Sequence, residues 1–544
     1  MADIISNELE RGDSVSTSAD IEMKARVEQH EQAGQVKLAP LFEDEELNVN
    51  FLDDNVEALR GQNLDFTEEE HKKLLRRQDM ILPPLMAMGI GMLLVDKKAI
   101  GSAATLTLQE NLHLHGSQYS LAVSIYFIGL LVGQYPANLL IQRYPTNKVA
   151  GIAAMLWSFV VLGTMGVQNG PQLLATQFLL GLFESPLLPS YTAVTSRFYR
   201  PEEQPMRFAF WNLGNTLFPI PFFLTYYGLG NTHTSIDAWR WIFLLLGLCS
   251  MVSAVLNYLY LPDKPSTCRW LTPRQRALAV IRMAKSQTGI KSHVFRSYQI
   301  KEALLDPKCW MLGLLFAFQQ TPLVLGTNFS GLTIKGFGYT GLQALLLQIP
   351  QWALGSIGCL AVGWLCTYVK FFQDKKSLCI AAIGCVMIVS CVMLHWNNQA
   401  SSGVRSKAIG MVFITMIDLN LAAYSIILAL LGQNIAGTTK KQVTMVITFI
   451  FYCLANICIP QSFLSSQAPH YQTGLITVLS TQVVYIIICV AWYVMLKVEN
   501  RRRDKTQGRQ GLSDPVSDEE IRARISAGLQ DETDKRNPYF RYKA

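Results

Sequence analysis

Five ionisable residues of this 544-residue chain lie inside long apolar stretches, where charged side chains are unexpected: Asp96, Lys97, Lys98, Glu184 and Asp418. If these stretches cross a bilayer, each charge costs about 2.5–3.5 kcal/mol at the helix centre. Such residues normally face a water-filled cavity or an opposite charge. A desolvated carboxyl group can take up and release a proton near neutral pH. The residue types therefore predict a carboxyl group that takes up and releases a proton.

Glu184 gives the clearest signal, because about a dozen residues of mostly apolar sequence lie on either side of it. Gln177, Gly181, Glu184, Leu188 and Tyr191 share one face of a helix at spacings of 4, 3, 4 and 3. A face that mixes an amide, a carboxyl and a phenol is typical of a helix lining a cavity, so Gln177 and Tyr191 are candidate substrate ligands. The alternative is a fixed hydrogen bond between two helices.

The other polar residues in apolar stretches have two interpretations each. Asp96, Lys97 and Lys98 either face a cavity or end a short first span. The second interpretation is open because the apolar run from Met80 to Val95 has only 16 residues. Asp418 is either part of a site or a polar group that joins helices. The amides inside spans are either substrate ligands or hydrogen-bonding contacts between helices; those taken as candidate ligands are Asn215, Asn328 and Asn434.

The distribution of charge indicates a membrane protein. Apolar residues make up 50% of the chain and charged residues 16%. Of 40 Asp and Glu residues, 20 precede Met80 and nine follow Met495, which leaves 11 for everything between. A water-exposed domain of that size would need more surface charge. The net charge of +7 comes from an acidic N-terminal tail and basic inner loops, so we expect no nucleic-acid partner.

Apolar runs of about 20 residues, the length needed to cross a bilayer as a helix, occur twelve times. The predicted spans are 80–103, 119–141, 149–168, 171–195, 208–229, 240–261, 309–332, 342–366, 377–395, 406–431, 442–463 and 474–496. A basic segment separates the first six spans from the last six. The sequence predicts an all-α membrane protein with twelve transmembrane helices in two six-helix bundles.

The segments outside the spans complete the predicted organisation. Residues 1–79 form an acidic, largely disordered tail with a short pre-membrane helix, which a capping box at Thr67 to Glu70 begins. The two bundles, 80–261 and 309–496, are joined by the linker 262–308, in which Thr272-Pro273 begins an amphipathic helix. Residues 497–544 form a C-terminal tail. Loops assigned to the cytoplasm hold 20 basic residues against three outside, so both termini are expected in the cytoplasm.

No feature of the loops predicts an enzyme. All eleven cysteines lie at or after Cys249, no CxxC motif occurs, and no nucleophile–base pair or phosphate-binding loop is present. We expect no catalytic residue, no metal and no cofactor. Membrane lipids are expected as partners, and the protein is expected to be a monomer.

Several segments together resemble a known family. Asp96-Lys-Lys-Ala-Ile-Gly-Ser-Ala103 and Phe178-Leu-Leu-Gly-Leu-Phe-Glu184 resemble first-span and fourth-span motifs of the anion:cation symporter branch of the major facilitator superfamily. Asn434-Ile-Ala-Gly-Thr-Thr-Lys-Lys441 and the tail Asp534-Lys-Arg-Asn-Pro-Tyr-Phe-Arg-Tyr542 resemble the fungal allantoate permease group. The resemblance covers nearly everything from Arg76 to Tyr542.

The resemblance implies uptake of a small organic anion, such as a carboxylate, ureide or vitamin, together with protons, in a major facilitator fold, most simply at the plasma membrane. It also suggests that Lys97 or Lys98 attracts the anion. It implies that Asp96 and Glu184 are proton sites and that Lys97 stands in for a first-span arginine. The sequence departs from the family at two positions: Gln177 replaces a fourth-span arginine, and Lys98 adds a cation. These departures imply a substrate other than that of the best-known relatives. Two alternatives keep the same fold: an exporter of a secondary metabolite and a nutrient sensor that does not transport.

Overall fold

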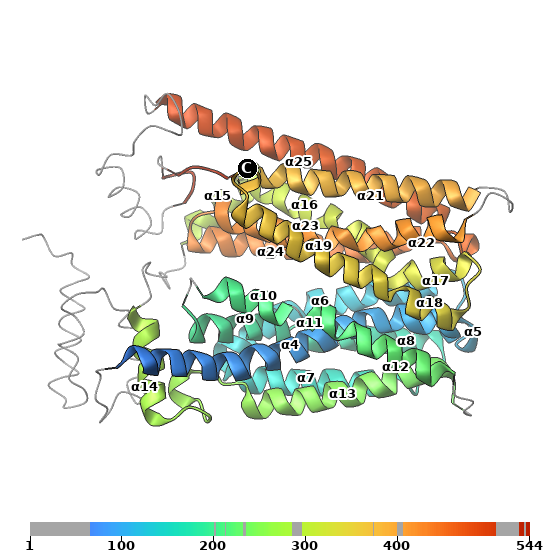
Figure 1. Cartoon of the computed structure of the whole chain (residues 1–544), viewed down its shortest axis with the longest axis horizontal. Coiled ribbons are helices and arrows are strands. Elements are labelled where there is room, and N and C mark those ends of the chain that lie inside the picture. The colour runs from blue at the N-terminus through green and yellow to red at the C-terminus, as the bar shows by residue number, and fades with distance from the viewer. Residues whose placement is uncertain are drawn as a thin grey trace, which may run out of the picture. The chain divides into compact units, whose positions relative to one another are not determined.

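The computed structural model describes residues 66–200, 203–212, 214–231, 236–285, 296–373, 375–399, 406–506, 533–537 and 540–543. These residues form helices and connecting turns, with no β-strand among them (Figure 1). The all-α fold class is therefore confirmed. The predicted disorder of the N-terminal tail concerns residues 1–65, which lie outside the described residues.

The chain divides into two compact units. The larger unit comprises residues 82–193, 207–261 and 289–544, and it contains most of the first predicted bundle and all of the second. The smaller unit comprises residues 1–81, 194–206 and 262–288. Within the smaller unit, α14 (Pro273–Lys285) begins at the predicted proline, and Arg274 of this helix pairs with Glu70 at 2.6 Å.

The helices of the first half pack in neighbouring pairs inside the larger unit. Helix α6 lies against α8, and α7 lies against α13 (Figure 1). In chain order the helices are α4 (Glu68–Leu106), α5 (Leu108–Asn111), α6 (Gln118–Arg143), α7 (Thr146–Thr164), α8 (Gly170–Glu184), α9 (Leu187–Phe198), α10 (Gln204–Asn212), α11 (Gly214–Leu217), α12 (Pro219–Gly230) and α13 (Ala238–Tyr260).

The second half pairs α16 with α24 and α21 with α25. Its helices are α15 (Ser297–Leu305), α16 (Pro307–Val324), α17 (Ser330–Gly336), α18 (Gly341–Leu347), α19 (Ile349–Tyr368), α20 (Lys370–Gln373), α21 (Lys376–Gln399), α22 (Lys407–Met416), α23 (Leu421–Asn434), α24 (Thr438–Cys458) and α25 (Gln472–Thr506). Two irregular turns interrupt this half: the π-helical η4 (Leu325–Phe329) and the 3₁₀-helical η5 (Ile417–Asn420).

Ten helical stretches among the described residues are long and apolar enough to cross a membrane. The predicted fourth and fifth spans correspond to α8 with α9 and to α10 with α11 and α12, and each is interrupted. Proline explains one break, because Pro186 has no N–H with which to continue the backbone hydrogen bonds, and the Ser185 hydroxyl donates to the Leu182 carbonyl at 2.8 Å. In the fifth span Pro219 is the first residue of α12, a position that proline tolerates.

The start of the first span differs from prediction. The capping box is present, since the Thr67 N–H donates to Glu70 Oε2 at 3.0 Å and the Glu70 N–H donates to Thr67 Oγ1 at 3.4 Å. However, the predicted short pre-membrane helix does not end before the span. Helix α4 continues through Pro83 and Pro84 to Leu106 as one helix of 39 residues. An apolar environment favours this continuity because it offers the backbone no other hydrogen-bond partner.

Candidate functional site

A buried ion pair connects the first and fourth predicted spans. Lys97 Nζ of α4 lies 2.9 Å from Glu184 Oε1, at the C-terminal end of α8. The hydroxyl of Tyr126 on α6 donates a hydrogen bond to the second oxygen, Glu184 Oε2. Only 5% of the Glu184 side chain is exposed. Both carboxylate oxygens are thus held by groups from two other helices.

Close packing of α6 on α8 brings these groups together. A Cβ atom added at Gly181 would lie 1.9 Å from the Tyr126 carbonyl oxygen, and one at Gly129 would lie 2.1 Å from the Phe178 carbonyl oxygen. Only glycine allows two helix backbones to approach this closely. The two glycines therefore set the distance at which the Tyr126 hydroxyl reaches Glu184.

Asp96 lies beside this ion pair on α4. The indole N–H of Trp157 on α7 donates to Asp96 Oδ2 at 3.1 Å. Asp96 is 6% exposed and Lys98 is 5% exposed, and α4 continues eight residues beyond Lys98. The interpretation in which Asp96, Lys97 and Lys98 end a short span at the surface is therefore wrong.

A second pair of opposite charges joins the two halves of the chain. Lys98 Nζ lies 3.8 Å from Asp418 Oδ2 in η5, and it sits 4.3 Å from the centre of the Trp352 ring. Gln351 Nε2 donates to Asp418 Oδ1 at 3.1 Å. The lysine belongs to the first half, whereas Asp418, Gln351 and Trp352 belong to the second. Any relative movement of the halves must change this contact.

Irregular helix geometry surrounds Asp418. The π-turn η4 places the Gly326 carbonyl 3.3 Å from Gln351 Nε2, which donates to it. A Cβ atom at residue 326 would lie 2.4 Å from Asp418 Oδ1, so only glycine fits. π-helical turns frequently occur at functional sites, because they re-aim side chains within an otherwise regular helix. Here η4 and η5 place a carboxylate opposite a lysine of the other half.

Aromatic rings form a chain beside these charges and cross from one half to the other. Tyr126 and Phe127 of α6 lie edge to face, with ring centroids 4.9 Å apart. Phe127 contacts Tyr452 of α24 at 5.8 Å, and Tyr452 contacts Phe316 at 5.9 Å. Phe316 also contacts Tyr424 at 5.0 Å. The rings supply apolar surface and three phenol groups, and the centre of the Tyr126 ring lies 5.9 Å from Lys97 Nζ. This combination is suited to an organic anion with an apolar part.

The remaining predicted ligands are less closely connected with this group. Gln177 is buried on α8, Tyr191 on α9 has its hydroxyl against Gly89 of α4, and Asn215 on α11 is half-buried. Asn328 is buried in η4, and its carbonyl accepts a 2.7 Å hydrogen bond from Tyr119. Their roles as ligands stay predictions.

Asn434 lies in different surroundings. Its Nδ2 donates to the carbonyl of Lys543 at 2.8 Å, and its Oδ1 accepts from the Lys543 N–H at 2.8 Å. A third hydrogen bond joins its Nδ2 to the Leu430 carbonyl at 3.0 Å. Because the C-terminal residues occupy this amide, we do not carry Asn434 into the site proposed below.

Four site residues were not found from the sequence: Tyr126, Trp157, Gln351 and Trp352. The three aromatic residues carry no signal, since aromatic side chains are common in apolar helices. Gln351 did carry a sequence signal that could have identified it. It is an amide in the middle of an apolar run, directly after the proline at position 350, and buried polar groups in spans normally have a partner.

Hydrogen bonds hold the halves together at the end where α6 begins and α24 ends. Tyr119 donates to the Asn328 carbonyl, Ser124 donates to the Ile457 carbonyl at 2.7 Å, and Gln461 Nε2 donates to Ser124 Oγ at 2.9 Å. This end of the site is therefore closed by direct contacts between α6 and the second half.

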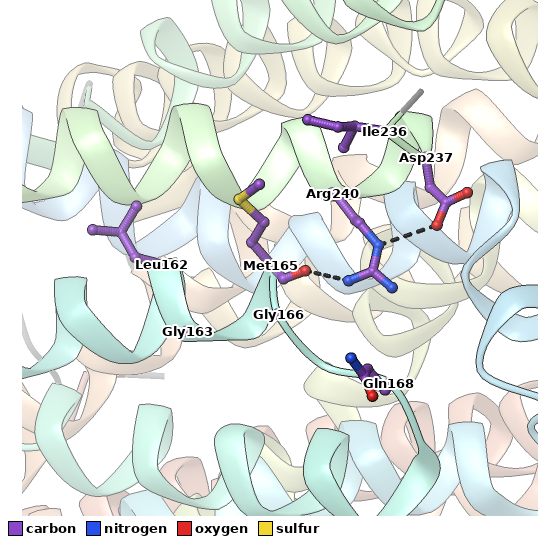
Figure 2. Close-up of a pocket in the computed structure, with 8 residues that line it drawn as sticks. All are labelled: Leu162, Gly163, Met165, Gly166, Gln168, Ile236, Asp237 and Arg240. Atoms are coloured by element: carbon purple, nitrogen blue, oxygen red, sulfur yellow. Dashed lines mark hydrogen bonds and ion pairs between the residues drawn. The ribbon is translucent and has the colours of Figure 1, made fainter. Parts of the chain in front are cut away.

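A separate pocket of about 600 Å³ lies where α7 ends and α13 begins, and it contains none of the predicted site residues (Figure 2). Its cation, Arg240, donates to Asp237 Oδ2 at 3.1 Å and to the carbonyl of Met165. These groups satisfy the guanidinium locally, so we assign this pocket no role.

Comparisons with known proteins agree with the all-helical fold and identify the family. Residues 86–460 match the family model described as Major Facilitator Superfamily. The chain belongs to this superfamily. It is 31% identical to an uncharacterized transporter of Schizosaccharomyces pombe, with 90% of each chain covered. It is 28% identical to the allantoate permease of Saccharomyces cerevisiae, with 89% of each chain covered.

Solved structures share the fold at low sequence identity. A bacterial homologue of the human lysosomal transporter Spinster, in an inward-facing conformation, aligns with a TM-score of 0.56 at 14% identity and covers 79% of this chain and 97% of its own. The xylose transporter XylE of E. coli gives 0.55 at 13% identity, covering 75% and 96%. The protein is a multi-pass membrane transporter of the major facilitator type and not an enzyme.

Proposed function

We propose that this transporter takes up a small organic anion together with protons by alternating access. The observation that carries the proposal is the buried ion pair of Lys97 and Glu184. Lys97 is the natural ligand for a substrate carboxylate, yet Glu184 already occupies it. An anion can bind Lys97 only if it displaces Glu184 or shares the lysine with it.

Protonation of Glu184 resolves this competition. Two carboxylates on Lys97, whose side chain is 24% exposed, would leave an uncompensated negative charge beside the buried Glu184, which is unfavourable away from water. A proton on Glu184 removes that charge and frees the Lys97 ammonium for the anion. One proton and one monovalent anion then bind together, and loss of the proton restores the ion pair and expels the substrate.

Lys98 and Asp418 connect this exchange to movement. The contact at 3.8 Å joins the halves across the site, so an anion that attracts Lys98 weakens the link to Asp418. Parallel repeats of this kind of transporter rock around a midplane site. Asp96, held by Trp157, is the second proposed proton site because it is a buried carboxyl on the same helix as both lysines.

The substrate class rests on the charges of the site and on the relatives. Two lysines and a row of aromatic rings favour a carboxylate with an apolar part. One relative is named allantoate permease, and another, 28% identical over 86% of this chain, is named a thiamine pathway transporter of S. cerevisiae. We propose a carboxylate, ureide or vitamin anion as substrate, and the plasma membrane, with cytoplasmic termini, as the location.

The test uses purified protein in liposomes with an imposed inward proton gradient. A panel of radiolabelled allantoate, short monocarboxylates and vitamin anions is screened for uptake at two external pH values. In Glu184→Gln we expect gradient-driven uptake to fall at least about tenfold, the effect of losing about 1.4 kcal/mol of coupling. Substrate exchange without a gradient should persist in part, because Lys97 remains.

Glu110→Gln is the matched control, since Glu110 is an exposed carboxylate on α5. It should keep both activities. Unchanged gradient-driven uptake in Glu184→Gln would remove this residue from proton coupling and with it the exchange proposed at Lys97.

A further inference from the structure

The described part of the C-terminal segment, residues 533–537 and 540–543, is anchored on the ends of α16, α24 and α25. Asp534 Oδ1 accepts from Lys440 Nζ at 2.7 Å, and Asp534 Oδ2 accepts from Lys308. Lys308 also donates to the Tyr542 hydroxyl. The Tyr542 N–H donates to Asn500 Oδ1 at 2.9 Å. The segment therefore lies in a fixed place beside α25.

A pocket of about 970 Å³ opens beside this segment. It is lined by the start of α16, the last turns of α25, and Lys535 and Tyr542 of the C-terminal segment. Four of its lining residues are basic, Lys308, Arg502, Arg503 and Lys535, whereas two are acidic, Asp306 and Glu499. The lining therefore has an excess of two positive charges.

The acidic groups of the lining are already paired. Asp306 Oδ2 lies 2.8 Å from Lys440 Nζ, and Glu499 Oε1 accepts from Arg503 Nε at 3.1 Å. Arg502 and Lys535 have only long contacts, 3.8 Å to Glu499 and 3.9 Å to Asp306. Their side chains are 80% and 42% exposed. These two cations are the ones available to a ligand.

The other wall of the pocket is apolar and continues along α25. Val494 and Val498 line the pocket and are 50% and 58% exposed. The same face of the helix exposes Ile487 and Val490 at spacings of three and four residues. A row of exposed aliphatic side chains on a membrane-crossing helix faces lipid chains. The pocket therefore lies where the lipid-facing surface of α25 meets its charged end.

We propose that this pocket binds an anionic phospholipid. The headgroup phosphate lies on Arg502 and Lys535, and one acyl chain lies along Val494 and Val498. Basic pockets at the ends of membrane helices are suited to such headgroups, because the charges lie at the depth of the phosphates. A soluble phosphate would use the two cations but would leave the apolar wall without a partner.

The test titrates the full-length protein in mild detergent with dioctanoyl phosphatidylinositol 4-phosphate and follows the melting temperature, whose concentration dependence gives the affinity. Each basic residue near an anionic lipid contributes about fivefold in affinity. We therefore expect the double variant Arg502→Gln/Lys535→Gln to need about thirtyfold more lipid, and each single variant about fivefold more.

The matched control is Arg501→Gln/Lys505→Gln, which removes the same charge from exposed positions on α25 that do not line the pocket. This control should bind the lipid as the unchanged protein does. Equal weakening in both double variants would overturn the site, as would equal stabilisation by dioctanoyl phosphatidylcholine. Binding of free inositol 1,4-bisphosphate as tight as that of the lipid would overturn the lipid assignment.

Discussion

Replacing Lys440 by methionine tests whether the C-terminal charge cluster holds the second half of the protein together. The Lys440 ammonium is fully buried and lies 2.9 Å from Glu302, 2.8 Å from Asp306 and 2.7 Å from Asp534. Methionine keeps the length and the apolar stem of the side chain. It leaves three carboxylates close together, with Lys308 and the more distant Lys535, 3.9 Å from Asp306, to compensate them.

The size of the effect follows from that imbalance. Removing one partner of a buried ion pair costs about 3–5 kcal/mol, because the other charge stays buried. For a domain of the size of this half, 1 kcal/mol shifts the melting temperature by about 2–4 °C, so we expect a loss of about 6–20 °C. Adding Asp534→Asn removes one of the stranded carboxylates. The double variant should therefore be less destabilised than the two single effects added together.

Thermal unfolding of the detergent-purified protein, followed by tryptophan fluorescence, measures these shifts. Lys441→Met is the matched control, because Lys441 is the next residue of α24 and its ammonium donates to the Gly432 carbonyl at 3.1 Å. Its substitution should change the melting temperature by less than about 2 °C. Equal shifts in Lys440→Met and Lys441→Met, or strictly additive effects with Asp534→Asn, would refute the reasoning.

Two further expectations concern the site and the effect of pH. Gly326→Ala places a Cβ atom 2.4 Å from Asp418 Oδ1; we expect a strain of about 1–3 kcal/mol and at least about a fivefold loss of uptake. Gly363→Ala, where an added Cβ meets nothing within 4 Å, should leave uptake unchanged, and equal uptake by the two variants would contradict the role given to Gly326. Burial alone would raise the pKa of Asp534, but Lys308 and Lys440 outweigh it and hold this pKa below its ordinary value. A lowered pKa means that the stabilisation is complete above about pH 5 and is lost as the pH falls further. Melting temperatures of the unchanged protein and Asp534→Asn at pH 8, 7 and 6 should therefore differ by a constant amount, and a difference that shrinks between pH 8 and 6 would contradict this assignment.

The sequence predicted the all-α fold and the helices that carry the site, because hydrophobic run length and charge placement are local properties. Asp96, Lys97 and Glu184 were recognisable as charges inside apolar runs, and the structure brings Lys97 and Glu184 into contact. The pairing itself was not predictable. Helix periodicity gives the face of each residue, but which faces meet depends on long-range packing such as that of Gly181 against Tyr126.

Two features of the structure were not visible in the sequence, for different physical reasons. The prediction ended the pre-membrane helix at Asp79 because charge and proline usually mark a boundary, but nothing forces the backbone to leave the helix at that point. Asn434 was read as a candidate ligand from its place in an apolar run. Its hydrogen bonds to Lys543, more than one hundred residues away in the chain, leave no trace in local sequence.

The anchoring of Asp534 has a consequence for the order in which the protein is made. Lys308 and Lys440 leave the ribosome long before Asp534 is translated, and until then Lys308 has Asp306 at 3.6 Å as its remaining carboxylate partner. The second half cannot complete its charge cluster until Asp534 has been translated. A nonsense mutation between Leu496 and Thr533 would thus yield a protein with every predicted span inserted but without the ion pairs of Asp534 to Lys308 and Lys440, a form that we expect cellular quality control to remove.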